Sequence, residues 1–80
     1  MKARIFVTLK PGVLDPQGKA IEGALASLGF AGVAGVRQGK VFDVEVAETD
    51  RAQAETALKA MAEKLLANTV IEKYEVALDT

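Results

Sequence analysis

The segment from Gly12 to Ala20 comes closest to a chemical motif, the phosphate-binding P-loop. A P-loop has four residues between two glycines, then a lysine and a serine or threonine that ligates magnesium. Here five residues separate Gly12 from Gly18, and an alanine follows Lys19. Pro16 also removes a backbone amide that a phosphate cradle would need. We therefore interpret this segment as a loop and a capped helix start.

Two further patterns could support catalysis, but both are weak. Asp43 and Glu45 share one face of a strand, yet nothing in the sequence buries them or shifts their pKa values. Residues 32–37, which end in Arg37, are similar to the phosphate cradle of acylphosphatases. That cradle follows the first strand of those enzymes, whereas this segment leads into the second strand. Arg37 is therefore expected to be a surface or interface residue.

The chain has no histidine and no cysteine. It therefore lacks the residues that most often act as general bases, nucleophiles and metal ligands. We expect no catalytic residue, no metal site and no cofactor bound by this chain alone.

The composition is that of one small folded domain. Eighty residues with half of them apolar predict a single domain over residues 1–80. The net charge of −1 disfavours nucleic acid as a partner. No apolar stretch approaches the roughly 18 residues that span a bilayer, and the N-terminus does not resemble a signal peptide. We expect a cytoplasmic protein without a membrane partner.

Four segments have strand patterns. Apolar and polar residues alternate over residues 3–9, 41–47 and 71–78, as in half-buried strands. Residues 33–38 form a weaker pattern, and Gly39-Lys40 would be a tight turn that joins them to residues 41–47. One face of the sheet would be open to solvent and carry Arg4, Phe6, Thr8, Asp43, Glu45, Lys73 and Glu75.

The first helix is expected between Asp15 and Gly29. Asp15 can cap the first turn, and Pro16 fits the first helical position because its missing amide loses no bond. Gly29 can end the helix in the left-handed conformation. The residues expected to face the core are Ile21, Ala24, Leu25 and Leu28.

The second helix is expected between Asp50 and Asn68. Asp50 is followed three residues later by Gln53, as in a capping box. Its predicted buried stripe consists of Ala54, Leu58, Met61 and Leu65. The order of elements is then βαββαβ, which predicts a ferredoxin-like α+β sandwich with a four-stranded antiparallel sheet and both helices on one face.

Residues 8–20, with the sequence TLKPGVLDPQGKA, strongly resemble the PurS family, the small subunit of phosphoribosylformylglycinamidine synthase. Further matches follow along nearly the whole chain, among them Leu28-Gly29-Phe30, Val36-Arg37, Gly39-Lys40 and residues 65–68. One departure is Thr69, where the family usually has a proline, and it affects the rigidity of that turn.

The resemblance implies a subunit of purine biosynthesis that forms a homodimer or a higher oligomer. It also implies that the chain joins a large synthetase subunit to a glutaminase subunit and supports ammonia transfer between them. ATP, magnesium and glutamine would be used by the complex, with the catalytic groups on the other subunits. The sequence leaves open whether this chain lines the ammonia route or only braces it.

Two patches are candidates for partner contact. The first comprises Lys10, Pro11, Gly12, Val13, Leu14, Asp15, Gln17, Gly18 and Lys19. The second comprises Arg37, Gly39 and Lys40. Val13 and Leu14 would be apolar anchors, although they could equally close the core of their own domain. The edge strands could instead pair across a dimer.

Two other classes of function remain as alternatives. A stand-alone ligand-binding regulatory module can have the same fold. If the chain were a small phosphatase, it would hydrolyse acyl phosphates and lose this activity in the variant Arg37→Ala. We expect no such activity.

Overall fold

The computed structural model describes residues 1–79, so that Thr80 of the expected domain lies outside the described residues. The elements, in order, are β1 (Lys2–Leu9), α1 (Pro16–Ser27), β2 (Gly39–Glu45), α2 (Arg51–Met61), the π-helical turn η1 (Ala62–Leu66) and β3 (Glu72–Asp79). The starts of these three strands and two helices agree with the sequence prediction to within a few residues, whereas the strand predicted over residues 33–38 does not occur in the described chain.

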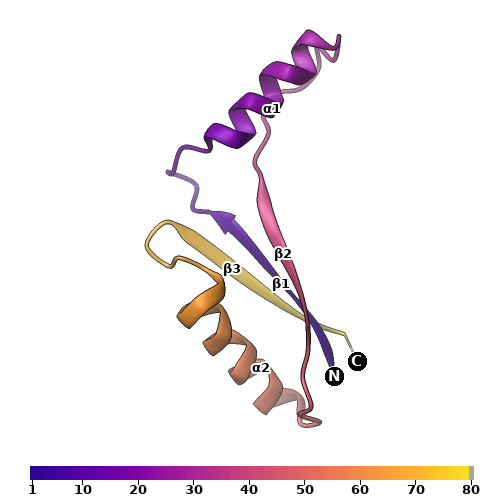
Figure 1. Cartoon of the computed structure of the whole chain (residues 1–80), viewed down its shortest axis with the longest axis vertical. Coiled ribbons are helices and arrows are strands. Elements are labelled where there is room, and N and C mark those ends of the chain that lie inside the picture. The colour runs from indigo at the N-terminus through magenta and orange to yellow at the C-terminus, as the bar shows by residue number, and fades with distance from the viewer. Residues whose placement is uncertain (80) are drawn as a thin grey trace.

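The three described strands form one antiparallel sheet in the order β2-β1-β3 (Figure 1). Ile5 in the central strand lies between Phe42 and Val76, which places these three side chains on the same face. On the opposite, open face, Arg4 forms an ion pair with Asp43 at 2.9 Å, and both side chains are largely exposed. The expected α+β class with an antiparallel sheet is therefore confirmed.

The predicted hairpin at Gly39-Lys40 is wrong, because the described sheet has three strands and residues 33–38 are irregular. Gly39 lies opposite Thr8 within the ladder. A Cβ atom at Gly39 would lie 2.8 Å from both Thr8 Cγ2 and the Val7 carbonyl oxygen. Glycine is present here because the two strands approach closely, and Gly39 is the first residue of strand β2 and not a turn residue.

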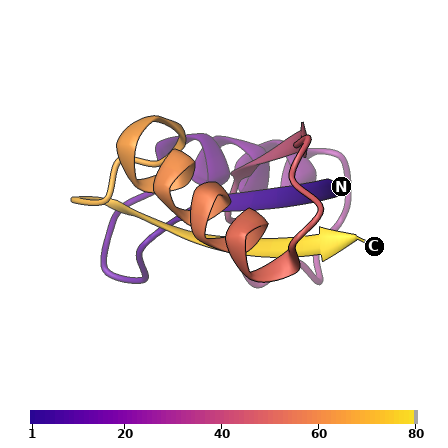
Figure 2. The same cartoon turned by 90° about the horizontal axis from the view of Figure 1, so that it is seen from below.

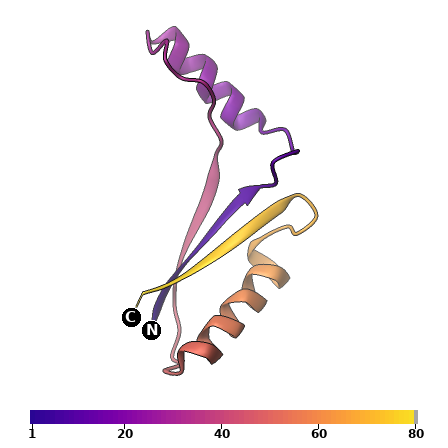
Figure 3. The same ribbon diagram turned by 180° about the vertical axis from the view of Figure 1, so that it is seen from behind.

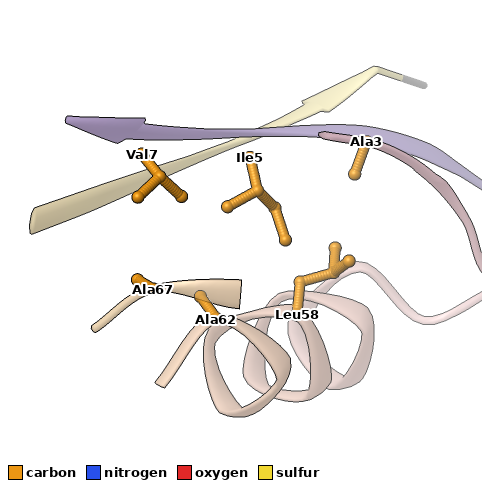
Figure 4. Packing of buried hydrophobic residues seen from close by; sticks show 6 residues of the cluster. All are labelled: Ala3, Ile5, Val7, Leu58, Ala62 and Ala67. Atoms are coloured by element: carbon orange, nitrogen blue, oxygen red, sulfur yellow. The ribbon is translucent and has the colours of Figure 1, made fainter. Parts of the chain in front are cut away.

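Helix α2 packs across one face of the sheet and forms the core with it (Figures 2 and 4). Leu58 and Ala62 are fully buried against Ile5 and Val7 of β1. Asp50 begins the helix as predicted, since its carboxylate accepts hydrogen bonds from the amides of Ala52 and Gln53. Ala3, Ala54 and Ala67 complete the set of buried apolar residues.

The end of the predicted α2 stripe is wrong for a local reason. The turn Ala62–Leu66 is π-helical, with the amide of Ala67 bonded to the carbonyl of Ala62. A π-helical turn inserts one residue, which rotates the residues after it relative to the core. Leu65, within this turn, is therefore 83% exposed, and Ala67 after it enters the core. Met61 lies before the turn and is 38% exposed because the buried stripe runs through Ala54, Leu58 and Ala62 at a spacing of four residues.

Helix α1 extends beyond the end of the sheet and does not lie beside α2 (Figures 1 and 3). The prediction of two helices on one face is therefore wrong for a single chain. The Cα radius of gyration is 15.9 Å, against about 12 Å for a compact domain of this length. In the stripe that was expected to be buried, Ile21 and Leu28 are exposed and Leu25 is half-buried.

The ends of α1 nevertheless agree with the sequence. Pro16 is the first helical residue and Asp15 is the N-cap. Gly29 has a φ of +96°, and the amide of Phe30 bonds back to the carbonyl of Leu25 at 3.0 Å. This pattern is a Schellman motif, in which glycine adopts the left-handed conformation at low cost.

Tyr74 provides a spectroscopic test of the contact between β3 and η1. Its hydroxyl donates a hydrogen bond to Glu63 Oε1 at 2.6 Å, which raises the pKa of the phenol above its usual value of 10.0. The neutral phenol therefore stabilises the fold below pH 10.0, and this contribution is lost as the pH rises through the raised value. Because Tyr74 is the chain's one tyrosine, its ultraviolet absorbance reports this ionisation directly.

We expect Glu63→Gln to move the Tyr74 midpoint back toward its usual value, because the carboxylate that disfavours the phenolate is lost. Glu55→Gln is the matched control, since it removes one carboxylate from α2 that pairs with Lys59. Equal midpoints in the wild type and in both variants would contradict the Tyr74–Glu63 contact.

Candidate functional site

The candidate partner residues gather where the chain leaves the sheet toward α1 and returns from it. We call residues 10–18 together with residues 36–38 the elbow. Asp15 is its centre, because one carboxylate oxygen accepts from the Gly18 amide at 2.8 Å and the other from the Gln38 amide at 2.7 Å. Asp15 thus caps α1 and ties the start of the helix to the returning chain.

The environment of Asp15 keeps its carboxylate ionised. The hydrogen bond from the Gln38 amide, and then that from the Gly18 amide, lower the pKa of Asp15 below its usual value of 3.8. The positive charge of Arg37 lowers this pKa further. An ionised carboxylate is an acceptor only, so it can hold both amides at neutral pH.

Arg37 joins the same two segments through its guanidinium group. It donates to the carbonyl of Val13 at 2.9 Å and to that of Lys10 at 3.1 Å. The carbonyl of Lys10 also accepts from the amide of Val13 at 2.9 Å. Arg37 therefore stabilises the elbow through backbone carbonyls, which differs from the anion-binding role of a phosphate cradle.

Gly18 is required by close packing in the elbow. It is buried in the first turn of α1, and a Cβ atom there would lie only 2.3 Å from the carbonyl oxygen of Val36. By contrast, a Cβ atom at Gly23 in the same helix would meet nothing within 4 Å. A side chain at Gly18 would push the returning segment away from α1.

The structure thus divides the predicted site residues into two groups. Asp15 and Gly18 are buried, and Gly39 lies in the ladder, so these three residues shape the backbone. Lys40 forms an ion pair with Glu72 at 3.5 Å and lies beside the elbow, where both residues line the same hollow as Val13 and Leu14. The exposed members of the first patch are Lys10, Pro11, Gly12, Leu14, Gln17 and Lys19, whereas Val13 is half-buried.

Leu14 is the most prominent apolar residue of the elbow. Its side chain is 71% exposed, so it does not close the core of its own chain. It lines a hollow of about 560 Å³ together with the apolar residues Val7, Leu9, Val13 and Ile71, while polar residues such as Gln17, Gln38, Lys40 and Glu72 form the rest of the lining. A partner chain could insert an apolar group here, next to Leu14.

A second apolar surface was missed by the sequence analysis. A hollow of about 590 Å³ lies between α2 and β2 and is lined by Val44, Ala57, Ala60, Met61, Lys64, Leu65 and Leu66. The small side chains of Ala57 and Ala60 would allow another helix to approach α2 closely. The periodicity of α2 could have indicated this surface, because these residues form a second apolar stripe beside the buried one.

Among residues 1–79 there is no cluster of three or more acidic side chains with the arrangement of a metal site. Within the same described range, each helix is too short or too polar to cross a bilayer.

Comparisons with known proteins agree on one family. Residues 2–80 match the family model described as "PurS: Phosphoribosylformylglycinamidine (FGAM) synthase". Phosphoribosylformylglycinamidine synthase subunit PurS of Synechocystis is 49% identical over 71 residues, which cover 89% of this chain and 71% of that protein.

Solved structures extend the similarity to three dimensions. A crystal structure of Bacillus subtilis PurS has a TM-score of 0.89 and 43% identity, covering 99% of this chain and 98% of that one. A chain in the structure of PurLQS from Thermotoga maritima has a TM-score of 0.88 and 36% identity, covering 95% of this chain and 93% of that one. Residues 10–38, which contain α1, make up more than a third of the chain. TM-scores this high over nearly the whole chain would not be reached if α1 pointed in a different direction in these relatives.

Proposed function

This chain belongs to the PurS family, a subunit of phosphoribosylformylglycinamidine (FGAM) synthase of purine biosynthesis, and we propose that it is the non-catalytic assembly subunit of that complex. It would join the synthetase subunit to the glutaminase subunit and support ammonia transfer between them. The similarity over 95% of this chain to a chain of PurLQS carries the proposal.

The residue types of the elbow fit a role in assembly. Its polar side chains bind backbone groups of the same chain, and its exposed residues are suited to contact with a protein surface. ATP, magnesium and glutamine would be bound by the other subunits. The complex would operate in the cytoplasm.

We further propose that the chain works as a homodimer in which α1 of each copy lies on the sheet of the other. The apolar stripe of α1 has no core to enter in its own chain, with Ile21 40% and Leu28 74% exposed. The hollow between α2 and β2 is apolar and open. Together, α1 and α2 would restore the ferredoxin-like sandwich that the sequence predicts, with its second helix supplied by the partner.

The small core supports the same proposal. Of the seven buried apolar residues, four are alanines, and only Ile5, Val7 and Leu58 are both large and fully buried. A chain of this size has little stability to spare without an added element. An isologous exchange of α1 would bury two apolar surfaces per copy in one symmetric contact.

Contact with the larger subunits would centre on Leu14. We expect Leu14→Asp to weaken retention of this chain by the synthetase and glutaminase subunits at least tenfold, because a charge would enter an apolar contact. A pull-down with ATP, magnesium and glutamine measures this, alongside the dimer mass of the variant in solution.

Val41→Asp is the control, because it places the same charge on the open sheet face at a residue that is 56% exposed. If Val41→Asp loses the partners while Leu14→Asp keeps them, the contact lies on the sheet and the elbow proposal is wrong. If the unmodified chain is retained by neither subunit, the assembly function itself is wrong.

A further inference from the structure

The elbow contains more bonding than a simple connection between a strand and a helix needs. Asp15 and Arg37 together make four hydrogen bonds, to the Gly18 and Gln38 amides and to the Lys10 and Val13 carbonyls. Three of these bonds join residues at least 23 positions apart in sequence. They hold the outgoing and returning segments side by side beyond the end of the sheet.

The sequence also contains patterns that would fit a closed chain, in which α1 would lie on the sheet of its own copy. Gly39-Lys40 is a suitable turn sequence, and residues 33–38 have a strand pattern. In a closed chain these residues would form a hairpin, and α1 would cover the hollow beside its own α2. The apolar stripe of α1 would suit that position as well as the same position on a second copy.

Chain length does not prevent closure. The eleven residues between Ser27 and Gly39 can span up to about 36 Å when extended, while β2 with seven residues is about 23 Å long. The returning segment is therefore long enough for α1 to reach its own sheet. What opposes closure is the bonding within the elbow, which would have to break.

We propose that Asp15, Gly18 and Arg37 form a clamp that directs α1 away from its own sheet and thereby selects an exchanged dimer over a closed monomer. This inference rests on the proposed dimer and adds the residues that determine which sheet α1 covers. Hinge segments commonly decide between closed and exchanged forms in this way. The clamp residues are positioning residues, because they act through the direction of α1.

Two pairs of matched variants test the clamp. Asp15→Asn keeps an oxygen that can cap Gly18 but replaces the acceptor of the Gln38 amide by a donor, whereas Asp50→Asn makes the same change at the N-cap of α2. Gly18→Ala introduces a methyl group that meets the Val36 carbonyl, and Gly23→Ala introduces one into open space. Arg37→Ala, at an exposed residue, serves as an additional variant.

The direction of α1 can be measured within a single chain. The chain has no native cysteine, so Ala26→Cys and Ala52→Cys give two spin-label sites, near the end of α1 and near the start of α2. These ends lie at opposite ends of the molecule, whose longest extent is 48 Å (Figure 1). Diluting labelled chains with unlabelled ones restricts the measured distance to one chain.

We expect the wild type, Asp50→Asn and Gly23→Ala to give a long intrachain distance and a dimeric mass. Asp15→Asn, Gly18→Ala and Arg37→Ala should give a population with a short distance and at least a tenfold higher dimer dissociation constant. Clamp variants that keep the long distance would overturn the clamp, whether or not their dimer weakens. A monomeric wild type would instead overturn the dimer of the proposed function.

Discussion

Leu58→Ala is expected to lower the free energy of unfolding by about 2–5 kcal/mol, the range for a leucine truncated in a packed core. Leu58 is fully buried and is the largest side chain that α2 contributes to the core, where its fully buried neighbours are residues of β1 and Ala62, and residues of β2 and β3 pack around them (Figure 4). A chain of this size has a total stability of roughly 4–12 kcal/mol. The variant should therefore lose a large share of its stability and unfold at a clearly lower denaturant concentration than the wild type.

Chemical denaturation followed by circular dichroism measures this loss, at one fixed protein concentration because dimerisation adds to stability. Leu14→Ala makes the same chemical change at a 71% exposed residue and should change stability by no more than about 0.5 kcal/mol. Equal losses in the two variants would show that Leu58 is not the centre of the core.

Signals that lie within one element were predictable from the sequence. Asp15, Gly29 and Asp50 act within a turn of the helix end they control, so their residue types were sufficient. The alternation of apolar and polar residues along β1 and β3 indicates one buried face, and both segments form strands as this pattern predicts. The α+β class and the positions of both helices follow from such local patterns.

The direction of α1 was not predictable because it depends on bonds between distant segments. The sequence identified Asp15 as a helix cap, but its second carboxylate oxygen binds the Gln38 amide 23 residues away. Gly39 permits either a turn or a close strand approach, and in the folded chain it lies opposite Thr8, close to that residue and to Val7. The four-stranded prediction was wrong because the turn interpretation was chosen at this one glycine.

The elbow residues also show the difference between local features, which the sequence predicts, and features that depend on distant segments. The run of prolines and glycines predicted a segment with a prescribed backbone conformation and partner contacts over residues 10–19, and the contact role stays a prediction. It did not separate Asp15 and Gly18, which shape that backbone from within, from Leu14, which faces solvent. Burial depends on the returning segment, and Arg37 and Gln38 reach the elbow only in the folded chain.

The exposed stripe of α1 leads to the second large prediction. We expect Ile21→Glu combined with Leu25→Glu to weaken the dimer at least ~100-fold. Each apolar side chain that becomes buried contributes about 1.5–3 kcal/mol, and the symmetric contact contains every substitution twice. A tenfold change in affinity corresponds to about 1.4 kcal/mol, so even partial burial of the stripe gives an effect of this size.

The control is a variant with two glutamates elsewhere on α1, Gly23→Glu combined with Ala26→Glu. These residues are exposed and lie outside the apolar stripe, so the same added charge should leave the dimer intact. Masses measured by light scattering over a concentration series distinguish the two variants, and circular dichroism verifies that α1 remains helical. If both variants dissociate equally, added charge alone explains the effect, and α1 does not cover the sheet of a second copy through this stripe.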